Sequence, residues 1–443
     1  MILSGAIALP LTIFLITLCL IVWRPRGIGI GLIALGGALV TLATGVVTLQ
    51  DVSTLWAMSW NATLTLIALV IISLILDAAG FWRGLALLLV HASLGRGRLL
   101  FCFVVLLGAI LTTLLTNNGT VLIWTPIVIE ILCVLGFRPK ATLAFAFATG
   151  FIADASSLPL PVSNWVNIIT TDYFQISFLR YALVMIPVHF VAIATGISVL
   201  WFYLDQYIPP TYSLASMPPP KSAIRDSLVC QWSCPVLGLL LIGYFVAQPL
   251  GIPISAISVC GALVIVALAQ RWLHKQDTPS ISIRKVVREV PWQFIVFSLG
   301  MYLIVFGLGK TDLTVLLSQT LTQLSGWGLT QVAMGTGFFA SVLSGLMTNL
   351  PTVLLDGVAI QNTFGIDPAV REVMVYANAI GCDIGAKISP IGSLSTLLWF
   401  DVLSRKGFHI TWHQYVGMAF ILTIPVLFMS LLSLAIWLPW LVT

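Results

Sequence analysis

Polar side chains interrupt this strongly apolar sequence at two short, similar motifs. Thr116-Asn117-Asn118-Gly119-Thr120 is followed 232 positions later (348 − 116 = 232) by Thr348-Asn349-Leu350-Pro351-Thr352. Amide and hydroxyl groups donate and accept hydrogen bonds without carrying charge. Such motifs are suited to holding a small polyhydroxy solute. The first candidate binding residues are therefore Thr116, Asn117, Asn118, Gly119, Thr348 and Asn349.

A second polar interruption, containing proline, follows each motif. The two segments span 154–164 and 381–393, and Gly150 recurs as Gly381 at an offset of 231 (381 − 150 = 231). Proline ends or kinks a helix, and unwound backbone deep in a membrane is tolerated only where protein or a water-filled cavity surrounds it. These segments supply the remaining candidate binding residues, Ser163, Asn164, Ser389 and Ser393.

Three ionisable residues of the same segments are candidates for proton coupling. Asp154 has no basic neighbour in the sequence, and burial of a carboxyl group favours its protonated form, so it is the preferred proton carrier. Asp383 and Lys387 are four residues apart, a spacing that predicts a salt bridge on one helix face. Asp356 or Asp401 could take the place of Asp154.

The composition excludes a soluble protein. Of 443 residues, 59% are hydrophobic and only 8% are charged, against about 25% charged in a typical soluble domain. The net charge of +5 does not indicate nucleic acid, because the basic residues lie mostly in short loops, where they set membrane orientation. The cysteines lack the spacing of a zinc site, and no nucleotide-binding glycine loop is present. We expect no cofactor, no metal site and no enzymatic activity.

Membrane-spanning helices need about 20 apolar residues. Basic loops place both termini outside a bacterial cytoplasmic (inner) membrane, and they give the two halves opposite orientations. Shorter amphipathic segments at 81–95 and 312–325 are expected in the interface. The predicted spans are 2–22, 28–47, 61–79, 178–203, 232–248, 253–271, 292–309 and 412–438.

The expected fold is an all-α, multi-pass membrane protein built from two inverted-topology repeats. The first repeat is 1–204, the second is 232–443, and a proline-rich cytoplasmic linker at 205–231 joins them. About ten transmembrane helices, two re-entrant hairpins and two broken helices account for the chain. Corresponding interruptions in two repeats are the best sequence pointer to a transporter site near the bilayer midplane.

Several runs of residues resemble the arsenite and antimonite efflux permeases, the membrane component of bacterial arsenical-resistance pumps. The resemblance extends over nearly the whole chain. In place of the Asn-Asp-Gly of that family's first tip, this chain has Asn117-Asn118-Gly119, which turns attention to Asp154 for proton coupling. The matching runs are 97–101, 122–129, 150–154 with Ser163-Asn164, and 375–383 with 390–394.

The resemblance implies proton-driven export of As(OH)3 or Sb(OH)3 from the cytoplasm. It also implies a hairpin-bearing transport domain that moves against a scaffold domain, as in the wider ion transporter superfamily. It leaves open a soluble arsenical-pump ATPase that docks at the linker. A sodium/proton antiporter or a carboxylate transporter of the same superfamily is the alternative. The shortage of Arg and Lys in the interruptions disfavours the carboxylate transporter, and the lack of a nucleophile-base pair argues against an intramembrane enzyme.

Overall fold

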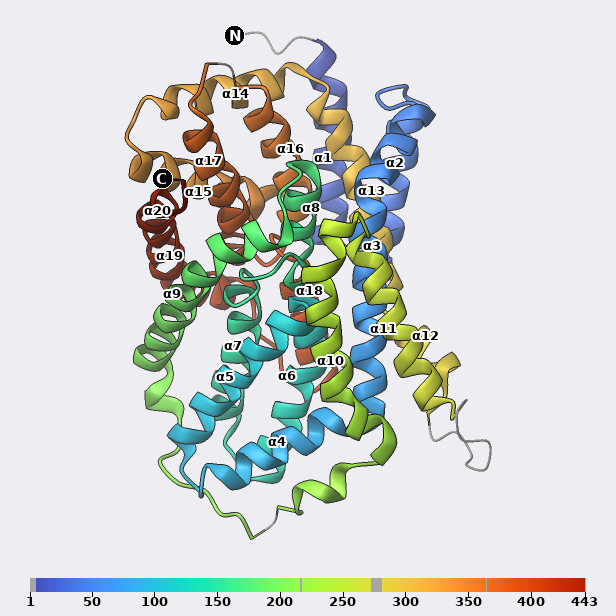
Figure 1. Ribbon diagram of the computed structural model, residues 1–443, viewed down its shortest axis with the longest axis vertical. Helices are drawn as coiled ribbons and strands as arrows, with labels where there is room; N and C mark the ends of the chain where they lie inside the picture. The colour runs from blue at the N-terminus through green and yellow to red at the C-terminus, as the bar shows by residue number, and fades with distance from the viewer. Residues whose placement is uncertain (1–4, 216, 272–280, 364, 443) are drawn as a thin grey trace.

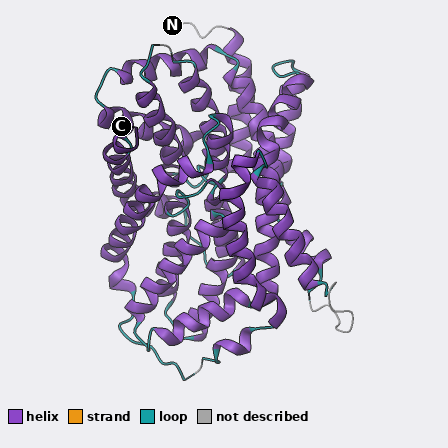
Figure 2. Ribbon diagram, viewed as in Figure 1, coloured by secondary structure: helices purple, strands orange, loops and turns teal. Residues whose placement is uncertain are grey.

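The chain folds into an elongated bundle of helices (Figure 1). The computed structural model describes residues 5–215, 217–271, 281–363 and 365–442. Within these ranges all regular structure is helical (Figure 2), and the isolated antiparallel bridge Arg96–Thr211 forms no strand. Eight of the described helices are long and apolar enough to cross a membrane. The predicted all-α, multi-pass fold is confirmed.

The helices of the first half follow the predicted spans with one extension. The segment 48–60, which lies between the predicted spans 28–47 and 61–79, is helical from Leu49 because Thr48 and Asp51 cap the helix start reciprocally. The helices are α1 (Gly5–Trp23), α2 (Ile30–Ala43), α3 (Leu49–Ala78), α4 (Phe81–Ala92), α5 (Gly97–Leu115), α6 (Asn117–Val134), α7 (Pro139–Ala155), α8 (Trp165–Tyr173) and α9 (Phe178–Leu204), with the 3-10 turns η1 (Pro25–Gly27) and η2 (Pro161–Ser163).

The second half repeats the same order of long helix, hairpin and broken helix. The short helix α12 was not predicted, and α10 takes up the last residues assigned to the linker. The helices are α10 (Ser227–Ala247), α11 (Ile254–Ala269), α12 (Ile283–Glu289), α13 (Trp292–Gly309), α14 (Asp312–Ser325), α15 (Leu329–Met347), α16 (Asn349–Gln361), α17 (Pro368–Asp383), α18 (Leu394–Arg405), α19 (Trp412–Trp437) and α20 (Pro439–Val442), with η3 (Asp205–Tyr207), η4 (Pro220–Ala223), η5 (Gln248–Leu250) and η6 (Gly385–Ile388).

The helices pack as two bundles. In the first, α2 lies along α13 and α3 along α11, with α1 and α10 beside them. The second contains the hairpins α5–α6 and α15–α16, the broken helices α7–α8 and α17–α18, and the long helices α9 and α19. The bundles meet where α3 contacts α6 and α8 and where α13 contacts α16. Asn61 of α3 donates to Asp172 of α8 across this boundary, at 2.8 Å.

Elements at corresponding positions of the two halves lie at opposite ends of the molecule. The helix α4 and the linker 205–231 lie at the lower end of Figure 1, whereas α14 lies at the upper end. The hairpin α5–α6 enters from the lower end and α15–α16 from the upper end. The division into inverted repeats stays a prediction, and this arrangement is what it requires.

Each hairpin turns at one threonine. Thr116 has φ 107° and Thr348 has φ 76°, values that a β-branched residue rarely adopts. The neighbouring residues on both sides are helical, so Asn117, Asn118 and Gly119 form the first turn of α6 instead of an unwound loop. The Thr116 hydroxyl accepts a hydrogen bond from the Gly119 N–H and caps that turn. The non-helical break at the first tip is therefore the single residue Thr116, which is shorter than the five-residue motif suggested.

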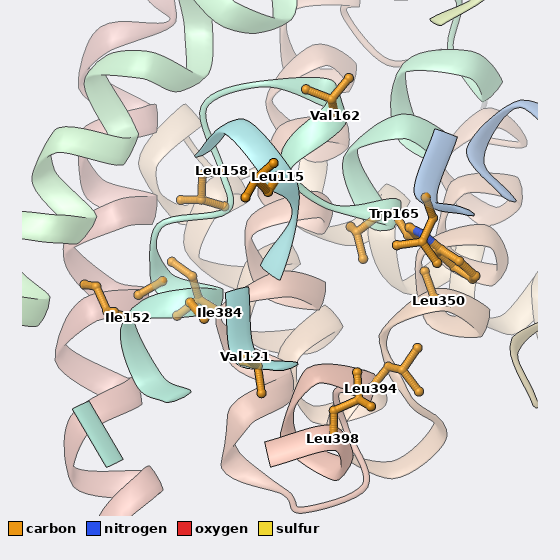
Figure 3. Packing of buried hydrophobic residues seen from close by; sticks show 14 of the residues in the cluster. Leu115, Val121, Ile152, Leu158, Val162, Trp165, Leu350, Ile384, Leu394 and Leu398 are labelled. Carbon is orange, nitrogen blue, oxygen red and sulfur yellow. The ribbon is translucent and has the colours of Figure 1, made fainter. Parts of the chain in front are cut away.

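The hydrophobic core surrounds these breaks. Leu115, the last residue of α5, lies beside Leu158 of the first broken segment (Figure 3). Trp165, at the start of α8, lies over Leu350 of the second hairpin (Figure 3). All four side chains are at most 5% exposed. Residues from both halves thus bury the hairpin tips in a shared core.

The linker is fastened to both ends of α4. The Arg225 N–H donates to the Ala79 carbonyl before α4, and the Gly97 N–H after α4 donates to the Pro210 carbonyl. Pro209 lies so close to Gly97 that a Cβ added there would sit 1.9 Å from the Pro209 carbonyl oxygen. The linker is an anchored strap along α4.

Replacing Gly97 with alanine is expected to displace this strap and to lower the free energy of unfolding by about 1–3 kcal/mol, the usual cost of overpacking. Gly84→Ala is the matched control, because its Cβ would have its nearest neighbour 3.7 Å away. Thermal unfolding in detergent measures both variants. Equal melting temperatures would show that the strap is not held at Gly97.

Candidate functional site

A buried ion pair links the two halves of the chain. Asp154 lies in the last turn of α7 and is fully buried. The Lys387 Nζ, from η6, lies 3.1 Å from the Asp154 Oδ2 and also donates to the Gly150 carbonyl. The predicted salt bridge between Lys387 and Asp383 is wrong, because α17 ends at Asp383 and the following 3-10 turn directs Lys387 to α7. The expectation that Asp154 lies in unwound chain is also wrong.

Two neutral donors complete the surroundings of Asp154. The Asn117 Nδ2 donates to Oδ1 at 2.8 Å, which ties the first hairpin tip to α7. The Ser395 Oγ, from the first turn of α18, lies 2.5 Å from Oδ1 and 2.6 Å from Oδ2. Ser393 supports Ser395, since their hydroxyls are 2.8 Å apart. Both carboxylate oxygens therefore have partners, as a buried charge requires.

The second buried acid, Asp383, is held by neutral groups. The Asn164 Nδ2 donates to its Oδ1 at 2.5 Å, and the Ser157 hydroxyl donates to its Oδ2. Asp383 is 1% exposed. Among the described residues, its hydrogen bonds come from uncharged side chains alone.

The two acids are bonded crosswise between the halves. Asp154 of the first half accepts from Ser395 of the second, and Asp383 of the second accepts from Asn164 of the first. Asn164 and Ser395 are themselves 231 positions apart (395 − 164 = 231), the offset that relates Gly150 to Gly381. We call Asp154, Asp383 and Lys387 the acid–lysine trio. With all three ionised, its net charge is −1, so one added proton makes it neutral.

The contacts of the remaining predicted residues are with groups other than the trio. Asn118 follows Asn117 in α6, and its side-chain oxygen is buried without a partner in the described structure. Ser163 instead donates to the Thr113 carbonyl at 2.9 Å, and so packs the first broken segment on α5. The Asn349 N–H donates to the Gly392 carbonyl at 2.7 Å, which joins the second tip to the segment between Ser389 and Ser393.

Three buried polar residues near the site were missed or weighted lightly. Ser157 and Ser395 bond the two acids, and both lie in or beside the polar interruptions, where their sequence position was a usable signal. Asp356 of α16 is 2% exposed, and both its carboxylate oxygens lack hydrogen-bond partners among the described residues. No pattern in the sequence indicates that the Asp356 carboxylate is buried without a partner.

A vestibule of about 810 Å³ opens between the two bundles. Its lining includes the exposed Arg24, Arg288 and Arg405 and the less exposed Leu122 and Leu397. Leu122 is in α6, the helix that begins with Asn117, and Leu397 is in the same turn of α18 as Ser395. The vestibule therefore reaches the two helices whose Asn117 and Ser395 side chains bond Asp154.

Comparison with known proteins agrees with this architecture. Residues 9–438 match the family described as arsenical pump membrane protein. The chain is 47% identical to an arsenical pump membrane protein of Escherichia coli over 436 residues, which cover 98% of this chain and 99% of that protein.

The chain belongs to the arsenical pump membrane protein family.

More distant relatives extend the comparison. A putative arsenical pump membrane protein of Bacillus subtilis is 28% identical over 444 residues, which cover 97% of this chain and 99% of that protein. Among solved structures, the YdaH transporter of Alcanivorax borkumensis matches with a TM-score of 0.54 at 14% identity. The match covers 96% of this chain and 98% of that one. At that identity the likeness concerns the fold alone. The family places the chain among arsenical transporters of the membrane.

Proposed function

We propose that this protein exports arsenite and antimonite as As(OH)3 and Sb(OH)3 in exchange for protons. The observation that carries the proposal is the acid–lysine trio at the hairpin tip of an arsenical pump family member. The surrounding amides and hydroxyls suit a neutral trihydroxide, because they bind hydroxyl groups without needing an opposite charge. The trio supplies the site for one exchangeable proton.

The proton assignment belongs to the trio as a unit, because closely coupled groups titrate together. The sequence favours Asp154 as carrier. In the structure Lys387 neutralises Asp154, while Asp383 has neutral donors only. We therefore assign the added proton to Asp383 when the trio is neutral. One proton crossing 100 mV releases about 2.3 kcal/mol, enough for a concentration gradient of about 50-fold.

Alternating access of the elevator type fits the two-bundle architecture. The bundle with α2, α3, α11 and α13 would act as the scaffold, and the hairpin-bearing bundle as the transport domain. The helices α4 and α14 join the two bundles at opposite ends of the molecule (Figure 1). Asn61 and Asp172 would separate during the movement, since they belong to different bundles.

In the proposed orientation the protein lies in the inner membrane of a bacterium, and the arginine-bearing vestibule opens to the cytoplasm. Short loops rich in Lys and Arg mark the cytoplasmic side, and the linker with Lys221 and Arg225 lies at the lower end (Figure 1). Both termini would then be periplasmic. The anchored strap is the surface we propose for a soluble arsenical-pump ATPase where one is present.

Replacing Asn117 and Asn349 together with alanine is expected to reduce arsenite uptake into everted vesicles to the level of empty vesicles. The Asn117 Nδ2 donates to the Asp154 Oδ1 at 2.8 Å. Asn117 is the first residue of α6 and Asn349 is the first residue of α16, so each lies at one hairpin tip. Asn362→Ala serves as the control, because Asn362 is an exposed residue at the far end of α16. Normal uptake by the double variant, at equal amounts of protein in the membrane, would refute the proposed site.

A further inference from the structure

A groove separate from the vestibule opens on the other flank of the hairpin-bearing bundle. It lies between α7, α9 and α19 and has a volume of about 660 Å³. Lys140, His409 and His413 lie along it together with Tyr203 and Tyr207, and none of the described residues that line it is acidic. The groove and the vestibule share no lining residue.

The inner end of the groove is closed by an aromatic plug, formed by Phe147, Trp399 and Tyr415. Phe147 lines the groove. Its ring packs edge-on against Trp399, with centroids 5.6 Å apart, and lies 5.9 Å from the ring of Tyr415. The Trp399 Nε1 donates to the Ala146 carbonyl at 2.8 Å, which fixes the plug to α7.

Behind the plug, a small cavity leads to the trio. It is lined by Gly150, Phe151, Lys387 and Thr396 together with the three plug residues, and its volume is about 10 Å³. A cavity of that size is near the lower limit for holding one water molecule. Phe147 lines both this cavity and the groove. The plug therefore lies between the groove and the cavity that Lys387 lines.

Polar groups continue through the plug. The Tyr415 hydroxyl is 3.4 Å from the Thr396 Oγ1, and both residues line the inner cavity. The histidines at the groove are exposed, and histidine is the side chain best suited to exchanging protons near neutral pH. A neutral trihydroxide, in contrast, gains nothing from the aromatic wall and is too large for the inner cavity. The route is suited to protons.

We propose that this groove is the cytoplasmic mouth of a proton pathway that begins at the acid–lysine trio, on its Lys387 side, and is distinct from the vestibule through which the metalloid enters. A proton leaving the trio passes the Tyr415 and Thr396 hydroxyls and is released to water in the groove. The inference rests on the proposed proton exchange. It adds that, on the cytoplasmic side, the substrate enters and the proton leaves through different openings.

The test blocks each opening separately by cysteine labelling in a background without native cysteines. Met418→Cys lies in the groove and Trp292→Cys in the vestibule. Phe420→Cys is the matched control, since it is exposed on α19 but lines neither opening. Each purified protein is labelled with a positively charged methanethiosulfonate reagent and reconstituted. Arsenite-driven proton movement and arsenite counterflow at equal pH are then measured in proteoliposomes.

Labelled Met418→Cys is expected to lose proton movement by about tenfold or more, a barrier increase of at least about 1.4 kcal/mol, while counterflow is retained. Labelled Trp292→Cys should lose both activities and labelled Phe420→Cys neither. Full proton movement in labelled Met418→Cys, equal loss of both activities there, or a failure of that cysteine to react would overturn the pathway. If the unlabelled protein moves no protons with arsenite, the proposed exchange itself fails.

A second variant tests the plug without labelling. Phe147→Ala opens the barrier between the groove and the inner cavity, so proton leak without arsenite should rise severalfold. Phe420→Ala removes an exposed ring of the same size and should leave the leak unchanged. An unaltered leak in Phe147→Ala, in protein that still performs counterflow, would also contradict the pathway.

Discussion

Replacing Lys387 with methionine is expected to lower the free energy of unfolding by about 3–5 kcal/mol, the range found when one partner of a buried ion pair is removed. Lys387 is 4% exposed and Asp154 is fully buried, so the substitution leaves a carboxylate deep in the protein without its countercharge. Transport should be lost as well, since the trio would carry a net charge of −2 when ionised. Unfolding monitored in detergent with increasing denaturant measures the change in stability.

The double variant Asp154→Asn/Lys387→Met distinguishes the stability lost through an unpaired buried charge from the stability lost through altered packing of the Lys387 side chain. With both charges gone, stability should recover by more than half, and the cycle of single and double variants gives the coupling energy. Asp401→Asn with Arg405→Met is the control cycle, because that pair is largely exposed and exposed pairs contribute about 0–1 kcal/mol. Equal coupling energies in the two cycles would contradict the assigned role of Lys387.

Asp383→Asn is expected to abolish proton-driven accumulation of arsenite while leaving exchange of arsenite across the membrane. The amide is neutral like the protonated acid and can keep hydrogen bonds with Ser157 and Asn164. The trio then needs no proton to become neutral. In everted vesicles the arsenite gradient should fall from a limit of about 50-fold per proton at 100 mV to about 1, with counterflow near the original rate.

Asp401→Asn is the matched control for this variant, since Asp401 lies in the vestibule wall and pairs with Arg405. A full gradient in Asp383→Asn would remove this residue from the coupling. Asp356 would then be tested in the same way, because it is a buried acid of the second hairpin whose carboxylate has no hydrogen-bond partner among the described residues. An added sodium gradient that restores accumulation would favour the sodium/proton antiporter alternative.

The fold could be predicted well because membrane helices follow from hydropathy. The predicted span 292–309 and the amphipathic segment 312–325 coincide with α13 and α14. The errors lie where capping and 3-10 geometry matter. Thr48 and Asp51 begin α3 earlier than the apolar run does, and the hairpins break at one threonine instead of over five residues.

The charged residues of the site could be predicted from the sequence, but their ion-pair and hydrogen-bond partners could not. Asp154, Asp383 and Lys387 stood out because charge is costly in a membrane. Their partners depend on contacts across more than 200 residues, such as Lys387 with Gly150 and Ser395 with Asp154. The i, i+4 spacing of Asp383 and Lys387 was misleading, because the α-helix ends between them. The positions of Ser157 and Ser395 in or beside the polar interruptions mark them as candidates, but the sequence does not show which acid each of them bonds.

The threonine turns at 116 and 348 have a consequence for affinity. Each tip departs from helical geometry at a single stiff, β-branched residue, and the residues that follow are already in the first turn of a helix. A solute that meets these groups has little chain left to order, so little conformational entropy is lost on contact. Weak polar contacts are then enough to bind a solute that must also be released. Replacing either threonine with glycine should make the tip more flexible, raise the entropy lost on binding and so weaken the affinity for the solute.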